Sequence, residues 1–191
     1  MFASTIRKAL FAFAALSALA MTAPAQAQQA DPENTIFLDT KDGRVVIRLR
    51  PDLAPKHVAQ IKTLTRQKFY DGAPFHRVID GFMAQTGDSK NRNGTGGSSL
   101  PNIPAEFSKE PYRRGTLGMA RSQSPDSANS QFFICFNNEG CGPLAGQYTI
   151  FGQVTAGMEF IDKVKKGSPS ANGTVTGPDN IVRMQVAADV K

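Results

Sequence analysis

The 191-residue sequence contains no tryptophan, only two cysteines and only two histidines. Zinc sites use Cys and His ligands at short, regular spacings, and no histidine or further cysteine lies at such a spacing from Cys135 or Cys141. The Gly-rich stretch 91–100 lacks the Gly-Lys-Ser/Thr and the following helix of a phosphate-binding loop, and its composition favours a flexible surface loop. We therefore expect no bound metal and no cofactor.

The sequence has one notable apolar run, and this run is short. Arg7 and Lys8 precede an uncharged stretch of Ala, Leu, Phe and Ser at residues 9–21, and Ala25-Gln26-Ala27 supplies the small residues of a cleavage site. This pattern is typical of a secretory signal peptide over 1–27 that is cut after Ala27. An uncleaved anchor is the disfavoured alternative, because the run is too short for a comfortable transmembrane helix. We expect an exported protein whose single mature domain covers 28–191.

A strong excess of one charge is also missing. Loss of Arg7 and Lys8 with the signal peptide lowers the formal net charge from +6 to +4, and the remaining basic residues are scattered. Runs such as 163–166 are typical of the solvated end of a helix, where cations suit the helix dipole. Without a continuous basic stripe, nucleic acid is a poor candidate partner.

The two cysteines leave one question open. Export makes a disulfide between Cys135 and Cys141 chemically permissible. The two positions are only six residues apart, so a bridge requires the intervening loop to double back sharply. The sequence does not decide between a disulfide and two free thiols.

Strand patterns predominate over helical ones. Asp52 offers an N-cap for a first helix that runs from about Pro55 to Thr65, and residues 157–166 predict a second short helix. His57 is expected on the surface of the first helix. No βαβ rhythm or internal repeat is visible, so an antiparallel barrel is the economical fold. We expect about eight strands, in or near the segments 35–40, 44–49, 75–79, 82–86, 115–121, 131–136, 148–154 and 180–190.

The stretch 75–88 is the most informative part of the chain. It predicts two short strands joined by a turn at Asp80-Gly81. Alternation of side chains puts Arg77 on one face of its strand, and Met83 and Gln85 on one face of the next. A cation, a thioether and an amide suit neither a dry core nor an ordinary surface, although a half-buried arginine paired with a carboxylate is the plain alternative.

A second strand carries a similar mixture. In 131–136, Phe132, Ile134 and Phe136 share the expected core face, whereas Gln131, Phe133 and Cys135 point the other way. Phe133 gains significance only if it lies beside Met83 and Phe82. His76 neighbours Arg77 but points to the opposite face, so we expect a hydrogen-bonded core histidine.

These motifs resemble the cyclophilin family of peptidyl-prolyl cis–trans isomerases. The resemblance covers nearly the whole mature chain in the family's order, and is closest to the short exported bacterial members, which implies a periplasmic location with secretion as the alternative. It implies an all-β-dominated fold, namely a closed eight-stranded antiparallel β-barrel capped by two α-helices. The matching segments are 75–88, Asn93-Gly94-Thr95-Gly96-Gly97, Gly118-Met119-Ala120-Arg121, Ser130-Gln131-Phe132-Phe133-Ile134 and Phe151-Gly152-Gln153-Val154.

The resemblance also implies the site residues. Arg77 falls on the family's catalytic arginine. Its hydrophobic proline pocket falls on Phe82, Met83, Phe133 and Leu144. Its contacts with the substrate backbone fall on Gln85, Ala120, Arg121 and Gln131.

Three positions depart from the family pattern. Tyr148 stands where many members have histidine, and its ring could still close the pocket. Arg121 replaces a frequent asparagine, although that contact is largely through the main chain. Pro143 occupies the place of the tryptophan of cyclosporin-sensitive members, so we expect weak or no cyclosporin binding.

The implied reaction is rotation about the bond that precedes proline, in proline-containing segments of folding exported proteins. Amide resonance opposes this rotation with a barrier of ~18–20 kcal/mol. A catalyst must favour the twisted state, in which the proline nitrogen gains a lone pair that a guanidinium can hydrogen-bond. The rival hypothesis is a proline-binding chaperone or adaptor module in which catalysis is incidental, and Arg77 discriminates between the two. By family analogy the protein is a monomer.

Overall fold

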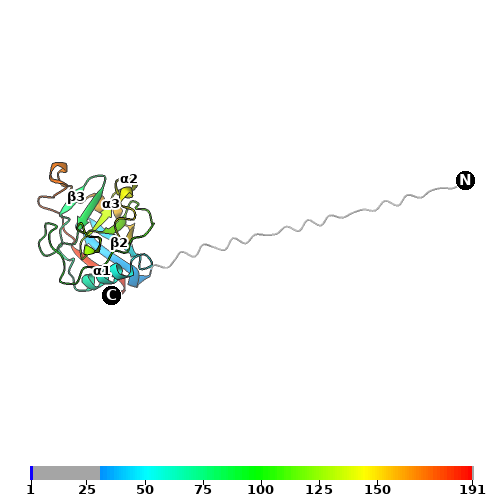
Figure 1. Ribbon diagram of the computed structural model, residues 1–191, viewed down its shortest axis with the longest axis horizontal. Helices are drawn as coiled ribbons and strands as arrows, with labels where there is room; N and C mark the ends of the chain where they lie inside the picture. The colour runs from blue at the N-terminus through cyan, green and yellow to red at the C-terminus, as the bar shows by residue number, and fades with distance from the viewer. Residues whose placement is uncertain (2–30, 191) are drawn as a thin grey trace.

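The computed structural model describes residue 1 and residues 31–190, so the predicted cleavage site at Ala27 and nearly all of the predicted signal peptide lie outside the described residues. One antiparallel sheet dominates the structure (Figure 1). It has eight strands, which pair in the order β3-β4-β6-β5-β7-β2-β1-β8. The strands are β1 (Thr35–Thr40), β2 (Gly43–Leu49), β3 (Arg77–Ile79), β4 (Met83–Thr86), β5 (Thr116–Met119), β6 (Phe132–Cys135), β7 (Ile150–Ala156) and β8 (Arg183–Val186).

The sheet is a curled half-barrel, so the predicted closed barrel is wrong. The edge strands β3 and β8 do not pair with each other. The segment that precedes β8 lies along β3 instead, and bonds it at single points: Val78 N–H donates to Gly173 O at 2.8 Å, and Gly167 N–H donates to Val78 O at 2.9 Å. Residues 167–178 contain two prolines and three glycines, which disfavour a continuous strand. The sheet therefore stays open between β3 and β8, because segment 167–178 lies along β3 and no continuous ladder of hydrogen bonds joins the two strands.

Helices are few and short apart from the first. In the part of the chain that the structure describes, they are α1 (Pro55–Arg66), α2 (Asn138–Cys141) and α3 (Met158–Asp162), and the other helical segments there are single turns of 3₁₀-helix. The helix α1 packs against β8 and β7, and α3 packs against β2. The two predicted helices are present, but the second ends at Asp162 and is shorter than expected, and the final strand ends at Val186. In residue 1 and residues 31–190, no helix combines the length and hydrophobicity needed to cross a membrane.

A distant carboxylate, and not the predicted Asp52, caps the N-terminus of α1. Glu106 accepts the backbone N–H groups of Lys56 and His57, each at 3.1 Å, while the Asp52 carboxylate is held by Arg50 at 2.8 Å. Glu106 also contacts the His57 ring, with 2.6 Å between Oε2 and Nδ1. His57 is completely buried, so its predicted place on the helix surface is wrong. Sequence spacing could not reveal a cap supplied from 50 residues away.

The core lies on two sides of the sheet. The residues of β6 divide between the two faces as the alternation predicted, but the sequence indicated an apolar core on only one of them. Phe132 and Ile134 belong to the main core with Phe136, and Phe133 and Cys135 belong to a smaller apolar cluster on the other side. This smaller cluster also contains Met83, Tyr112, Cys141 and Ile150. The second cluster forms the floor on which the candidate site is built.

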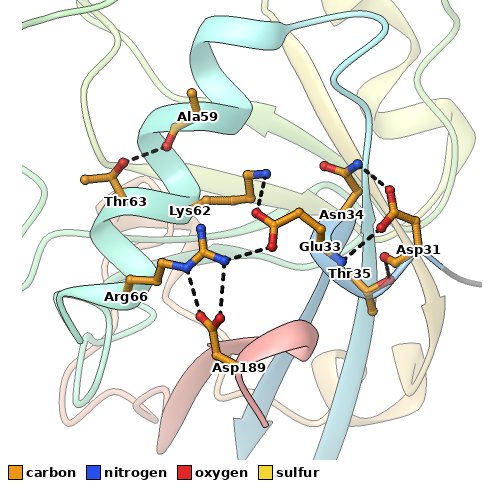
Figure 2. Close-up of polar contacts among 9 residues, drawn as sticks. All are labelled: Asp31, Glu33, Asn34, Thr35, Ala59, Lys62, Thr63, Arg66 and Asp189. Carbon is orange, nitrogen blue, oxygen red and sulfur yellow. Dashed lines mark hydrogen bonds and ion pairs between the residues drawn. The ribbon is translucent and has the colours of Figure 1, made fainter.

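An ion-pair network joins the first and last described elements to α1 (Figure 2). Arg66 on α1 donates to Glu33 in the 3₁₀ turn Pro32–Asn34 and to Asp189 in the 3₁₀ turn Ala187–Asp189, with 2.9 Å for the shortest contact of each pair. Lys62 donates to the other Glu33 oxygen at 2.9 Å. The hydrogen bonds from Arg66 and Lys62 lower the pKa of Glu33 to about 2. These contacts hold the segment that begins at Asp31 against α1.

Candidate active site

The β3–β4 hairpin places the candidate catalytic arginine. Its predicted turn is present at Asp80-Gly81, and Gly81 has a φ of +68°, which glycine adopts without steric cost. The register pairs Arg77 with Gln85 and Ile79 with Met83. Because directly opposite residues share a face of the sheet, the guanidinium, the amide and the thioether come together as the alternation predicted.

Polar contacts on both sides fix the Arg77 guanidinium. Its Nε donates to Asn172 O and its Nη2 to Asn172 Oδ1, both at 3.0 Å, and its Nη1 donates to Gln85 Oε1 at 3.3 Å. Within residues 31–190 no carboxylate lies at ion-pair distance, so the alternative of an arginine neutralised by a nearby acid does not hold. Burial lowers the pKa of Arg77 from its usual high value, and the side chain remains a cation near neutral pH.

A relay of two glutamines continues from Arg77 to the Gly-rich loop. Gln85 Nε2 donates to Gln131 Oε1 at 2.9 Å, and Gln131 Nε2 donates to the carbonyls of Gly94 and Gly96. Asp88, which is completely buried, holds this loop by accepting four of its backbone N–H groups. Burial alone would raise the pKa of Asp88, but these backbone hydrogen bonds lower it overall. The loop is thus built around a carboxylate and is not a free surface loop.

An apolar pocket of about 190 Å³ opens beside Arg77. Phe133 forms its floor, stacked on Tyr112 with a centroid distance of 5.9 Å and edge-on to Tyr148 at 5.8 Å. Leu144 lies in a 3₁₀ turn, Gly142–Leu144, directly after α2. The pocket is lined by Arg77, Phe82, Met83, Gln85, Ala120, Arg121, Phe133, Leu144 and Tyr148.

A disulfide connects two walls of this pocket. Cys135 at the end of β6 is bonded to Cys141 in α2, with 6.1 Å between their Cα atoms. Asn137 makes the required reversal by capping α2, since its Oδ1 accepts the Gly140 N–H at 2.7 Å. The sequence left open whether the two cysteines form a disulfide. They do, because the loop between them doubles back through one helical turn. Phe82 is held to the same region, because its carbonyl accepts the Phe136 N–H at 2.9 Å.

Arg121 and Tyr148, two of the three residues that depart from the family pattern, contact each other. The Arg121 guanidinium lies over the Tyr148 ring, 4.5 Å from its centroid. It also donates to the carbonyls of Gln147, Ser122 and Gln123 at 2.9–3.2 Å. Together these contacts place a second guanidinium at the mouth of the apolar pocket.

A polar groove adjoins the pocket and shares Gln85, Ala120 and Arg121 with it. Gln131, the one predicted site residue that does not line the apolar pocket, lines this groove. The groove is otherwise bordered by the Gly-rich loop 94–97 and by small polar residues such as Ser122, Ser127 and Asn129. The structure therefore brings all ten predicted site residues into one continuous depression.

Three features of the site could not be anticipated from the sequence pattern. Asn172 holds Arg77 from 95 residues away, and its only local signal is the Asn-Gly pair with φ of +51° at Asn172. Asp88 organises the Gly-rich loop, and Tyr112 supports Phe133. His76 is buried as predicted, but neither of its ring nitrogens has a hydrogen-bond partner within the described residues.

The chemical groups of the site are a hydrogen-bond donor, the Arg77 guanidinium, and the apolar pocket beside it. In the part of the chain that the structure describes, no cluster of three or more His, Cys, Asp or Glu side chains could hold a metal ion. Three of the five Arg77 N–H groups have partners there, which leaves one on Nη1 and one on Nη2 for a bound molecule. The site therefore has the size and the chemistry to accept a small apolar ring beside a cationic donor.

Comparisons with known proteins identify the class. The family described as cyclophilin type peptidyl-prolyl cis-trans isomerase matches residues 35–186. A probable peptidyl-prolyl cis-trans isomerase of Brucella suis is 58% identical, over 98% of this chain and 100% of its own length. Peptidyl-prolyl cis-trans isomerase B of Escherichia coli is 34% identical, over 72% and 88% of the two chains. The chain belongs to the cyclophilin-type peptidyl-prolyl cis–trans isomerases.

Solved structures agree with this assignment. A cyclophilin from Hirschia baltica superposes with a TM-score of 0.73 at 26% identity, covering 85% of this chain and 77% of its own. A cyclophilin-type isomerase from Cryptosporidium parvum, crystallised in the presence of the dipeptide Ala-Pro, gives a TM-score of 0.72 at 27% identity, covering 80% and 98%. The chain is therefore an isomerase of peptide bonds that precede proline.

Proposed function

We propose that Arg77 is the catalytic residue and that the apolar pocket holds the proline ring during rotation of the preceding bond. The observation that carries this proposal is the position of an arginine with spare N–H donors on the wall of a pocket formed by Phe82, Met83 and Phe133. In the twisted state the imide nitrogen loses conjugation and gains a lone pair. A fixed guanidinium can donate to that lone pair and stabilises the twisted state more than either planar state.

The remaining residues position the substrate in this proposal. Leu144 and Tyr148 complete the pocket around the ring, while Gln85, Gln131 and the backbone near Ala120 and Arg121 hold the flanking chain. The Gln85–Gln131 relay is pinned to the carbonyls of the Gly-rich loop, so its donors and acceptors are fixed before a peptide binds. Such preorganisation reduces the reorganisation required when the bond twists.

The catalytic role is tested by replacing Arg77. We expect Arg77→Ala to lower kcat/KM on an Ala-Pro peptide by about 100-fold, because one preorganised donor to developing charge is worth about that much. Arg77→Lys keeps the charge but loses the fork of donors, and should recover only part of the activity. Exchange rates by NMR, with circular dichroism as the control for folding, measure both. Undiminished turnover in folded Arg77→Ala would refute the assignment of Arg77 as the catalytic residue.

We further propose that the protein is exported to the periplasm and works on proline-containing segments of exported proteins that are folding there. The signal-like pattern over 1–27 supports export, and the Cys135–Cys141 disulfide suits an oxidising compartment. Expression of the full chain in a bacterial host should give a mature protein that begins at Gln28 in the periplasmic fraction. N-terminal sequencing checks this expectation, and an intact Met1 terminus in the cytoplasmic fraction would contradict it.

Two smaller points complete the proposal. The protein acts as a monomer, which sedimentation velocity can test.

Cyclosporin binds weakly or not at all, because Pro143 is exposed, does not line the pocket, and carries no indole ring to cover the ligand. Titration calorimetry with cyclosporin measures this, and a submicromolar Kd would contradict it.

A further inference from the structure

The charges around the depression are of one sign. Arg77 and Arg121 both line the apolar pocket, Arg121 also lines the polar groove, and no aspartate or glutamate lines either. Within residues 31–190, no carboxylate lies within 4 Å of either guanidinium. A surface cleft lined by one sign of charge attracts ligands of the opposite sign.

The contacts of Arg121 orient it without neutralising it. Carbonyl oxygens accept four hydrogen bonds from three of its nitrogens, and the Tyr148 ring lies beneath it. Carbonyls and aromatic faces are dipolar or quadrupolar partners, so the unit charge of the guanidinium remains. One of its five N–H groups, on Nη2, has no hydrogen bond within the described residues and could donate to a ligand.

The position of Arg121 indicates which part of a peptide it meets. With the proline ring in the apolar pocket, the imide nitrogen must face Arg77, and Gln85 lies beside Arg77 and borders the polar groove. The residue before proline is attached to that nitrogen. It must therefore cross the boundary shared by the pocket and the groove, where Arg121 lies.

We infer that Arg121 is a specificity-determining residue, which makes this isomerase favour peptides with aspartate or glutamate immediately before proline over peptides with lysine there. The inference rests on the proposed function of the site. Arg121 acts here through its charge, so its effect should appear in the comparison of substrates and not merely in the overall rate. A neutral Ala-Pro peptide reports the overall rate, and so separates a change in overall rate from a change in substrate preference.

The test compares kcat/KM on three peptides that differ only in the residue before proline: Glu, Ala and Lys. At low salt we expect about a 5- to 10-fold ratio of Glu-Pro to Lys-Pro, because attraction for one and repulsion of the other combine at a separation of a few ångströms. The ratio should shrink in ~1 M NaCl, where the screening length is only about 3 Å. A fourth peptide with Glu after proline shows whether the position matters.

Three variants assign the effect to Arg121. Arg121→Asn should lower the ratio to about twofold, the remainder coming from Arg77, whereas Arg121→Lys should keep most of it. Arg48→Asn is the matched control, because Arg48 is an exposed residue of β2, three strands away from β6, and has no ion pair among residues 31–190. The control should leave the ratio unchanged.

The outcomes are distinguishable. A wild-type ratio near one, an unchanged ratio in Arg121→Asn, or an equal preference for Glu after proline would overturn the inference while leaving the proposed function intact. Loss of Ala-Pro turnover in the wild-type protein would overturn the proposed function itself. If Arg121→Asn fails to fold, Arg121→Gln, which removes the charge but keeps more of the side chain, carries the same test, and an unchanged ratio in Arg121→Gln would overturn the inference.

Discussion

At the scale of single residues, the contact between Asn172 and Arg77 is one that the sequence does not predict. It holds two nitrogens of Arg77 through one backbone and one side-chain oxygen, from an exposed loop with left-handed backbone geometry. Asparagine tolerates this conformation better than most residues. The residue therefore combines a turn preference with a role in orienting the guanidinium.

Replacement of Asn172 by glycine isolates the side-chain contact. Glycine adopts the same φ without strain and keeps the carbonyl that accepts from Nε. We expect Asn172→Gly to lower kcat by about three- to tenfold with little change in KM, because the guanidinium loses one orienting bond out of three. Rates on an Ala-Pro peptide provide the measurement.

A double-mutant cycle is the control for a general effect on the fold. In an Arg77→Ala background, Asn172→Gly should have no further effect on kcat, since the group that it orients is gone. Equal losses in both backgrounds would mean that Asn172 acts on the fold and not through Arg77.

At the scale of elements, the disulfide between β6 and α2 fixes the wall that carries Leu144. We expect Cys135→Ser/Cys141→Ser to lower the free energy of unfolding by about 2 kcal/mol, the value for closing a short loop. The double variant should also have a higher KM for proline peptides, because the 3₁₀ turn Gly142–Leu144 is no longer tied to β6 through the disulfide. Urea unfolding and steady-state kinetics measure the two effects.

A reductant provides the matching control. Dithiothreitol should bring the wild-type protein to the stability and KM of the double variant, and should leave the double variant itself unchanged. Identical KM values for oxidised, reduced and double-variant protein would show that the bridge supports the fold without shaping the pocket.

The elements also show what sequence reasoning can reach. The β3–β4 hairpin and both faces of β6 followed from alternation and turn chemistry, which are local rules. The cap of α1 by Glu106 and the burial of His57 depend on a partner 49 or 50 residues away, which no spacing rule contains. The closed barrel failed for a different reason, because the Pro and Gly residues of 167–178 keep this segment from pairing with β3 as a continuous strand.

The site was predictable to a greater extent than the closure of the sheet. Ten residues spread from Arg77 to Tyr148 came from resemblance to a family, and the structure brings them into one depression. Their roles in substrate binding and catalysis stay predictions. The supporting residues, Asp88 and Asn172 among them, act through other residues, and their motifs carry no signal of that function.

At the scale of the whole molecule, two buried histidines predict how stability depends on pH. Burial lowers the pKa of both His57 and His76 below the usual value near 6.5, against opposing effects of Glu106 and Asp88. The unfolded chain therefore binds more protons than the folded chain just below pH 6.5. The free energy of unfolding should fall as the pH is lowered from 7 to 5.

Urea unfolding at several pH values tests this expectation. His57→Asn removes one of the two titrating groups, so its stability should change less between pH 7 and pH 5 than that of the wild-type protein. The carboxylates of Glu106 and Asp88 have lowered pKa values, and their contribution is lost only at still lower pH. Equal stability of the wild-type protein at pH 7 and 5 would contradict the expectation.

The shared contacts of Arg66 with Glu33 and Asp189 have a practical consequence (Figure 2). They bring the two ends of the described segment 31–190 onto the same helix, so a short Gly/Ser linker could join residue 190 to residue 31 and new ends could be opened in a distant surface turn. A circular permutant of this kind would keep the depression intact. It would also allow a cargo protein to be fused beside the apolar pocket and not behind α1.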